Sequence, residues 1–123
     1  YALREGRAGI ERASGTPLTE LRASGGGAQS DGALQLTADV FRLRVGRPHT
    51  HETSGLGAAI NLAVGLGLHA STQDAVAAMT RVERWFEPQP DAADRYDRLF
   101  TEVYRPLYGR VRPVLRALHR MGP

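Results

Sequence analysis

The chain has 123 residues, 41% hydrophobic and 24% charged, a balance typical of one small folded domain that excludes disorder throughout the chain. All 16 basic residues are arginine and cysteine is absent, which excludes a Walker A lysine, a lysine Schiff base, disulfides and thiolate catalysis within this sequence. The net charge of +3 is modest and the arginines are spread out, so we expect no nucleic-acid partner.

The sequence begins at Tyr1, without an initiator methionine or an apolar leader, and we expect it to be a piece of a longer protein. The absence of cysteine is compatible with the cytoplasm, which is the location we expect. The longest apolar run, residues 56–68, falls short of the about 20 residues that a bilayer span needs, so we expect no membrane partner either.

Helix, strand and helix are predicted in turn over the first third of the chain. Residues 2–13 carry apolar side chains at helical spacing, and the segment Ser-Gly-Thr-Pro at 14–17 ends that helix. Residues 18–23 alternate imperfectly between apolar and polar side chains, which predicts a short strand. Helical periodicity returns from about Ser30 to Leu43, with Ser30 or Asp31 as the expected N-cap.

Between this strand and this helix lies the segment Ser-Gly-Gly-Gly-Ala-Gln-Ser at residues 24–30, which we call the glycine corner. Three glycines give a backbone that can adopt positive φ and has no Cβ to keep a ligand away. The helix that follows offers unpaired N–H groups and the positive end of its dipole. The corner therefore predicts a nucleotide site, although three glycines also suit a plain tight turn.

A second strand is predicted at Arg44 and Val45, ended by Gly46 and Pro48, which completes a strand–helix–strand unit. The spacing Gly-x-Gly-x-x-Ser in the corner approaches the dinucleotide-binding fingerprint. The second strand carries Arg44 and Arg47 where an acidic residue would bind a ribose hydroxyl. An NADP-binding, Rossmann-like oxidoreductase fragment is therefore one alternative function.

The polar residues near the corner are expected to have structural roles instead of catalytic or metal-binding ones. His49 and His51 could point the same way toward a metal, but no further ligands at a suitable spacing accompany them, so we expect a solvated loop. Asp31 is expected to cap the helix, Asp39 to make a hydrogen bond along the helix face, and Glu52 to order the loop.

Three helices are predicted over the rest of the chain. The first, Gly55 to about Leu68, is apolar nearly all round and rich in small residues, so we expect it to be buried and expect Gly57→Leu to overpack it. The second begins at a capping box of residues 71–74 and continues to about Arg84. The third runs from Asp91 to about Arg120, with Pro106 and Pro113 kinking or dividing it.

The last helix is amphipathic. Its apolar and aromatic side chains recur at three- and four-residue steps, which predicts packing on the back of the sheet, and its seven arginines lie largely on the other face. A non-enzymatic, arginine-rich helical interaction module that binds an acidic partner is the second alternative function.

Several blocks of the sequence, in their order and spacing, carry a resemblance that covers nearly the whole chain. They are LRASGGGAQS (21–30), LQLTADV (34–40), ETSGLGAAI (52–60), FEP (86–88), YDRL (96–99) and YRPLY (104–108). Together these blocks resemble the C-terminal domain of FGGY-family carbohydrate kinases such as xylulokinase and glycerol kinase.

The resemblance implies an α/β fold, part of an actin-like, ribonuclease H-type ATPase lobe with a small sheet, flanking helices and long C-terminal helices. It implies ATP-dependent phosphorylation of a sugar or polyol hydroxyl, with Mg²⁺ held mainly by other parts of the enzyme. By this likeness the backbone of Gly26 and the side chain of Ser30 hold adenosine, and Gly25, Gly27 and Gln29 line the same slot.

The resemblance also implies what this chain lacks. Residues 1–123 would be a single incomplete domain, the nucleotide-binding C-terminal portion, while the catalytic aspartate, the phosphate loops and the sugar-contacting residues lie upstream. We therefore expect no catalytic residue and no metal ligand here, and no activity of this piece alone. Which sugar or polyol is phosphorylated, and whether the enzyme is a homo-oligomer, stay open at the level of sequence.

Overall fold

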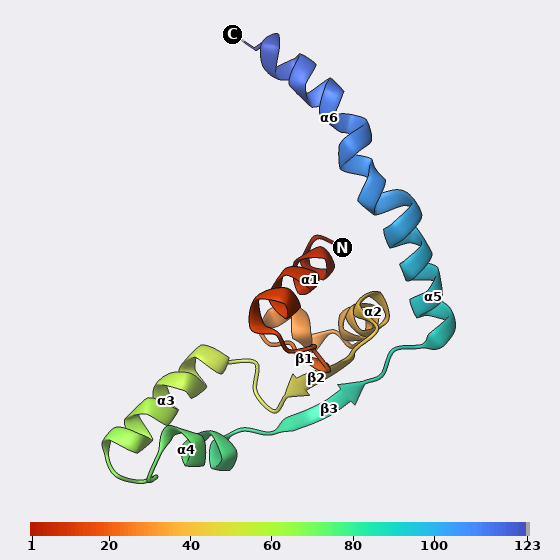
Figure 1. Ribbon diagram of the computed structural model, residues 1–123. Coiled ribbons are helices and arrows are strands. Elements are labelled where there is room, and N and C mark those ends of the chain that lie inside the picture. Colours follow the sequence, from red (N-terminus) through yellow and green to blue (C-terminus); the bar gives the residue numbers. More distant parts are fainter. Residues whose placement is uncertain (123) are drawn as a thin grey trace.

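The computed structural model describes residues 1–122 and shows a mixed α/β architecture (Figure 1). The elements are, in chain order, α1 (Ala2–Ser14), β1 (Glu20–Arg22), the 3₁₀ turn η1 (Gly26–Gln29), α2 (Asp31–Phe41), β2 (Arg44–Pro48), α3 (Thr53–Gly65), α4 (Thr72–Met79), β3 (Val82–Phe86), α5 (Pro90–Arg98), the π-helical segment η2 (Leu99–Tyr104) and α6 (Arg105–Arg120). No helix within residues 1–122 has the length and apolar character needed to cross a membrane.

The three strands form one sheet in the order β1-β2-β3. β1 pairs in parallel with β2, with Leu21 opposite Val45, and β3 pairs antiparallel to β2, with Phe86 opposite Val45. The parallel pair is joined through η1 and α2, as a crossover connection requires. The predicted strand–helix–strand unit is confirmed, and it places the glycine corner at the carboxyl end of β1.

The core lies where α2 and the glycine corner cover the middle of the sheet. Its buried members are Ala28, Leu34, Ala38, Val45 and Phe86, with Leu21 and Ala23 packed against them. Ala28 belongs to η1 itself, so burial of one small side chain anchors the turn to the same core as the sheet.

Asp39 is buried and connects α2 to the segment before α5. Its Oδ1 accepts hydrogen bonds from Gln35 Nε2 at 3.0 Å and from the backbone N–H of Gln89 at 2.7 Å. The first of these is the hydrogen bond expected along the helix face. The second lets a buried carboxylate fix the approach of α5 to α2.

Two sequence predictions near the sheet are wrong. β2 does not end at Val45 but continues through Gly46 and Arg47 to Pro48, and the helix predicted to reach Arg84 ends at Met79 and gives way to β3. Val82, Trp85 and Phe86 are β-branched or aromatic and favour a pleated surface. Pairing along β2 therefore overrides the weak helical pattern of this segment.

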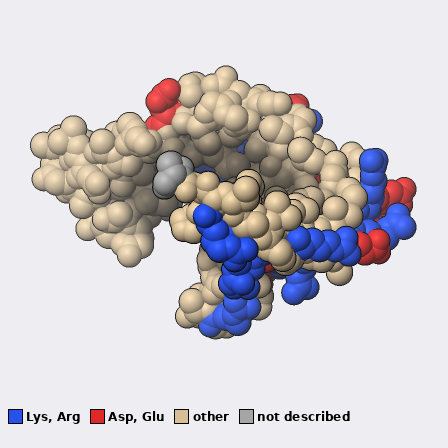
Figure 2. All heavy atoms as spheres, turned by 90° about the horizontal axis from the view of Figure 1, so that it is seen from above, with Lys and Arg blue, Asp and Glu red and all other residues tan. Residues whose placement is uncertain are grey.

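The expectation that α3 is buried is also wrong. Only Ile60 and Ala63 are buried, while Leu62 and Leu66 are 63% and 66% exposed. A Cβ added at Gly57 meets no described atom within 4 Å, so the predicted overpacking by Gly57→Leu does not apply to this chain. Figure 2 shows that the α3 and α4 side of the molecule is nearly free of charged side chains. Its apolar surface thus faces outward.

The C-terminal helical stretch is divided next to Pro106, as predicted, but α6 continues through Pro113. α5 packs against α2, the π-helical segment η2 follows, and α6 begins around Pro106 and keeps Pro113 inside. α6 extends away from the sheet (Figure 1). The prediction that its apolar stripe packs on the back of the sheet is wrong for the residues described, because Leu107, Leu115 and Leu118 are all about half exposed or more.

α1 and α5 are held to the body by Asp97. Its carboxylate contacts Arg4 of α1 and accepts a hydrogen bond from Arg42 Nη1 at 2.6 Å. Tyr1 adds a hydrogen bond from its hydroxyl to the carbonyl of Tyr96 at 3.1 Å. Burial acts to raise the pKa of Asp97, but the hydrogen bonds from Arg42 and Arg4 outweigh it, so the net pKa lies below its usual 3.8.

Asp97→Asn is expected to lower the free energy of unfolding by about 1–3 kcal/mol, because the half-buried Arg4 and Arg42 lose their charged acceptor. The contribution of a carboxylate with a lowered pKa is present above the pKa of the unfolded chain and is lost as the pH falls through the folded pKa. Urea unfolding at pH 7 and at pH 3 measures it. We expect the difference between wild type and variant to shrink at pH 3.

Asp94→Asn is the matched control for this prediction. Asp94 also contacts Arg42, at 2.7 Å, but its side chain is 65% exposed. Exposed ion pairs contribute about 0–1 kcal/mol, so the control should stay near wild type. Equal effects of both substitutions, or a difference that does not depend on pH, would contradict the role given to Asp97.

Candidate functional site

The glycine corner leads from β1 into α2 through a single turn of 3₁₀ helix. The N–H of Ala28 donates to the carbonyl of Gly25 at 3.1 Å, and the N–H of Ser30 donates to that of Gly27 at 3.3 Å. Ser30 then caps α2, because its Oγ accepts from the N–H of Ala33 at 3.3 Å. The predicted strand-to-helix turn and the predicted N-cap are both confirmed.

The turn presents bare backbone at the surface. A Cβ added at Gly25, Gly26 or Gly27 would meet no atom of the described chain within 4 Å. Ala28 is buried, but Gln29 and Ser30 on either side of the helix start are exposed. An external group can therefore approach the peptide planes of residues 25–27 directly, which side chains would prevent.

Gly25 needs to be glycine for a conformational reason. Its φ of 88° with ψ of −179° lies in a region that is essentially restricted to glycine. Gly25→Ala is therefore expected to cost about 1–3 kcal/mol of unfolding free energy, measured by chemical denaturation. Gly27→Ala, which has equal space and no positive φ, is the control and should cost clearly less. Equal losses from the two variants would contradict the strain at Gly25.

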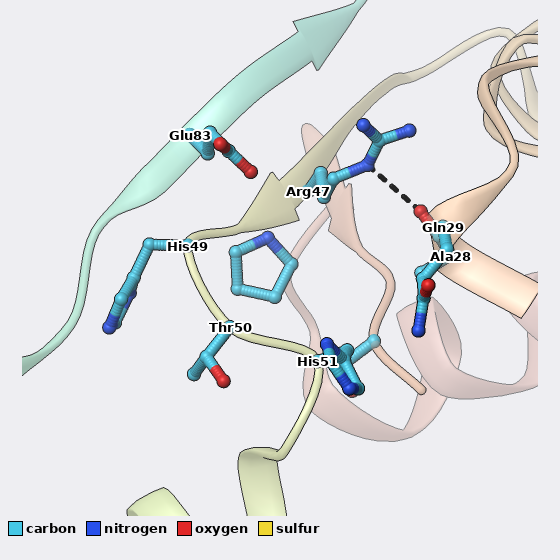
Figure 3. Close-up of a pocket in the computed structure, with 9 residues that line it drawn as sticks. Ala28, Gln29, Arg47, His49, Thr50, His51 and Glu83 are labelled. Atoms are coloured by element: carbon cyan, nitrogen blue, oxygen red, sulfur yellow. Dashed lines mark hydrogen bonds between the residues drawn. The ribbon is translucent and has the colours of Figure 1, made fainter. Parts of the chain in front are cut away.

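A pocket of about 260 Å³ opens beside the corner. Figure 3 shows Arg47 of β2 reaching across toward η1, the loop after β2 along one side, and Glu83 of β3. Because parallel strands β1 and β2 end at the same edge of the sheet, the segments that follow them converge there. The lining residues are Ser24, Ala28, Gln29, Arg47, Pro48, His49, Thr50, His51 and Glu83.

Arg47 and Arg84 enclose the start of α2. Arg47 Nε donates to the carbonyl of Ala28 at 2.9 Å, and its Nη2 contacts Asp31. Arg84 Nη1 donates to the other oxygen of Asp31 at 2.5 Å. The hydrogen bond from Arg47 and the charge of Arg84 hold the pKa of Asp31 below its usual 3.8. Asp31 thus pairs with two strands, and the expectation that it serves as the cap gives way to Ser30.

The five residues predicted to form the site lie close together, but only one of them lines the pocket. Gln29 lines the pocket, whereas Gly25, Gly26, Gly27 and Ser30 lie next to it on the exposed turn. Ser30 Oγ is already an acceptor as N-cap, and its hydroxyl hydrogen can still donate to a ligand.

Sequence reasoning missed the wall of the pocket formed by the loop after β2 and by Glu83. The sequence predicts a solvated loop around His49 and His51, yet both side chains line the pocket together with Thr50. The signal was present in the parallel strand order, which brings both strand ends to one edge. Glu83 could not be placed, because its segment was predicted as helix.

The two arginines considered for a ribose phosphate are both engaged within the chain. Arg44 donates to Glu20 at 2.6 Å and its guanidinium lies 4.3 Å from the Trp85 ring centroid. Arg47 contacts Ala28 and Asp31, as described. Neither is poised to bind the 2′-phosphate of NADP without breaking these contacts.

Metal ligands do not converge in the described part of the chain. His51 Nε2 lies 3.1 Å from Glu52 Oε1, but no group of three or more His, Asp or Glu side chains within residues 1–122 could hold an ion. These residues therefore do not provide a site that fits Mg²⁺, and no chemical step is assigned to a metal held by this chain.

Comparison with known proteins agrees with this architecture. Residues 1–66 match the C-terminal domain of the FGGY family of carbohydrate kinases. The chain is 35% identical over 99 residues to the xylulose kinase of Staphylococcus epidermidis, covering 80% of this chain and 20% of that protein. It is 42% identical over 89 residues to the glycerol kinase of Methylibium petroleiphilum, covering 70% and 18%.

Among solved structures, the xylulose kinase from Rhodospirillum rubrum superposes with a TM-score of 0.75 at 30% identity, over 94% of this chain and 23% of that one. This likeness confirms the predicted α/β fold as part of the actin-like ATPase fold of such kinases. The chain spans about a fifth of the length of the curated relatives it matches. Because the family match alone covers residues 1–66 of 123, the chain belongs to the FGGY family of carbohydrate kinases.

Proposed function

We propose that this chain is the nucleotide-binding, C-terminal portion of an enzyme that transfers the γ-phosphoryl group of ATP to a hydroxyl of a sugar or polyol. Family membership supports the reaction class, and the relatives named above are xylulose and glycerol kinases. A cytoplasmic location, where ATP is available as co-substrate, is part of this proposal.

The open glycine turn beside a pocket is the observation that carries the nucleotide assignment. In the proposal, adenosine lies against the backbone of Gly25, Gly26 and Gly27, with the side chains of Gln29 and Ser30 at its edge. The pocket of about 260 Å³ is below the roughly 300–1,000 Å³ typical of complete ligand sites, which suits one end of ATP instead of the whole molecule.

The proposal divides the work between this chain and the rest of the enzyme. Residues 1–123 supply the adenosine end, while the catalytic base, the phosphate-binding loops and Mg²⁺ belong to the other part. Exposed apolar side chains on α3 and α6 support this division, because they offer surface for further protein to cover. They include Leu62, Leu66, Leu107, Val114, Leu115 and Leu118.

Such a division fits the chemistry. Phosphoryl transfer depends mainly on positioning the acceptor hydroxyl and on stabilising charge at the γ-phosphate, which requires groups on both sides of a closing cleft. A chain that holds only adenosine binds nucleotide weakly and transfers nothing. The proposed inactivity of this piece follows from that geometry.

A phosphorylation assay of the full-length enzyme tests the proposal. The enzyme is incubated with ATP and Mg²⁺ and with xylulose and glycerol in turn, and ADP formation is followed. We expect ADP formation that depends on one of these acceptors, and no oxidation or reduction with NADP or NADPH. Acceptor-independent ATP hydrolysis, or turnover of NADPH instead of ATP, would reject the proposed reaction.

A further inference from the structure

We propose that Arg47 is a positioning residue that fixes the glycine corner in the shape that receives the nucleotide. The inference rests on the proposed function and goes beyond it, because Arg47 lies on β2, outside the glycine motif. It acts through the carbonyl of Ala28 and through Asp31.

The corner needs such a device because glycine-rich backbone is costly to order. Each glycine loses more conformational freedom on folding than any other residue. Within residues 25–30, two backbone hydrogen bonds hold the turn, from the N–H of Ala28 to the carbonyl of Gly25 at 3.1 Å and from that of Ser30 to Gly27 at 3.3 Å. Both are local, so the hydrogen bonds within the turn do not tie its backbone to the sheet, and the buried Ala28 side chain anchors it there through apolar packing alone.

Arg47 supplies the connection between the turn and the sheet. Its Nε donates at 2.9 Å to the carbonyl of Ala28, near the end of the 3₁₀ turn, and its Nη2 contacts Asp31 in the first turn of α2. One planar guanidinium thus binds both sides of the junction at Ser30, and a fork of fixed geometry orders two groups at once. Figure 3 shows the first of these contacts.

The guanidinium is itself held in place from behind. Its carbon lies 5.2 Å from the Phe86 ring centroid, and Phe86 is part of the buried core. Asp31 is paired a second time by Arg84 of β3, at 2.5 Å. Arg47 therefore ties the turn itself to β2, whereas Arg84 reaches only Asp31 in the first turn of α2 and makes no hydrogen bond to the turn.

This arrangement predicts a specific kinetic effect. Arg47 is engaged by protein groups, so its loss should loosen the nucleotide slot without touching the sugar site. An interaction that serves binding of the ground state and transition state alike changes KM and leaves kcat nearly unchanged. We expect Arg47→Gln to raise the KM for ATP about tenfold, the loss expected for one charge-assisted hydrogen bond.

The experiment uses the full-length enzyme and the matched variants Arg47→Gln and Arg84→Gln. Arg84→Gln removes the same charge and the second contact to Asp31, yet Arg84 makes no hydrogen bond to the turn. We expect its KM for ATP to stay within about twofold of wild type, with KM for the sugar unchanged in both variants. Hydrogen exchange at the amides of Ala28 and Ser30 should accelerate in Arg47→Gln only.

Arg47→Lys is the conservative variant and keeps the charge. A single ammonium cannot span Ala28 and Asp31 as the fork does, so we expect an intermediate KM, and this variant serves the same comparison if Arg47→Gln does not fold. Equal KM values for ATP in the Arg47 and Arg84 variants, or parallel increases for ATP and sugar, would overturn the inference. An unchanged KM for ATP in Gly26→Leu would reject the proposed nucleotide site itself. A raised KM in Gly26→Leu with an unchanged KM in the Arg47 variants would reject only the positioning role of Arg47.

Discussion

Gly26→Leu in the full-length enzyme is expected to raise the KM for ATP at least about tenfold, which corresponds to about 1.4 kcal/mol of lost binding. A Cβ at residue 26 meets no described atom within 4 Å, and Gly26 is not among the glycines with positive φ. The fold can therefore accept leucine there. The side chain would occupy the space in which the proposal places adenosine, so steady-state kinetics with varied ATP measure the clash.

Gly6→Leu is the control for this substitution. Gly6 lies on the exposed face of α1, with no described atom within 4 Å of an added Cβ, and leucine is the better helix former. We expect wild-type KM values for ATP and for the sugar. An unchanged KM for ATP in Gly26→Leu, with both proteins folded by circular dichroism, would reject the adenosine assignment.

Gly46→Val is expected to destabilise the fold by about 1–3 kcal/mol or more, because it overpacks the middle strand of the sheet. Gly46 is buried, and a Cβ there would lie 2.9 Å from Trp85 Cζ3 and 3.0 Å from Val82 Cγ1. The Trp85 ring is kept in place by the guanidinium of Arg44 at 4.3 Å. Urea denaturation followed by far-UV circular dichroism measures the loss of unfolding free energy.

A double mutant tests the mechanism of this loss. Trp85→Leu removes the ring that the new side chain would meet, so Gly46→Val should cost markedly less in a Trp85→Leu background than in wild type. The coupling is expected to be about 0.5–3 kcal/mol, the range for residues in contact. Additive effects of the two substitutions would show that the ring is not the obstacle.

Much of the α/β unit was predictable because local signals and tertiary structure agree there. Apolar periodicity in α2, the capping hydroxyl of Ser30 and the break at Gly25 all point to strand, turn and helix, and Val45 falls in the second strand as predicted. β3 was missed because its five residues follow a capped helix without a glycine or proline between them. Only its pairing with β2, which covers Gly46 with Trp85, makes it a strand.

The predicted burial of α3 and of the apolar stripe of α6 was also wrong, and the reason is physical. The apolar patterns of α3 and α6 report surfaces that require a partner, but a pattern does not say where the partner lies in the chain. In residues 1–122 those faces are largely exposed. The pocket wall formed by His49, Thr50 and His51 was not predicted for a related reason. A polar loop lines a pocket only because the strand order brings it next to the glycine corner, and the loop's own sequence does not indicate that neighbour.

The crystal structure of the full-length enzyme with a non-hydrolysable ATP analogue tests the central claim most directly. The account predicts that the adenosine group lies against the backbone of residues 25–27, with Ser30 Oγ and Gln29 at its edge and the Arg47 contact to Ala28 intact. An adenosine group bound away from the glycine corner, with the turn left facing solvent, would contradict it.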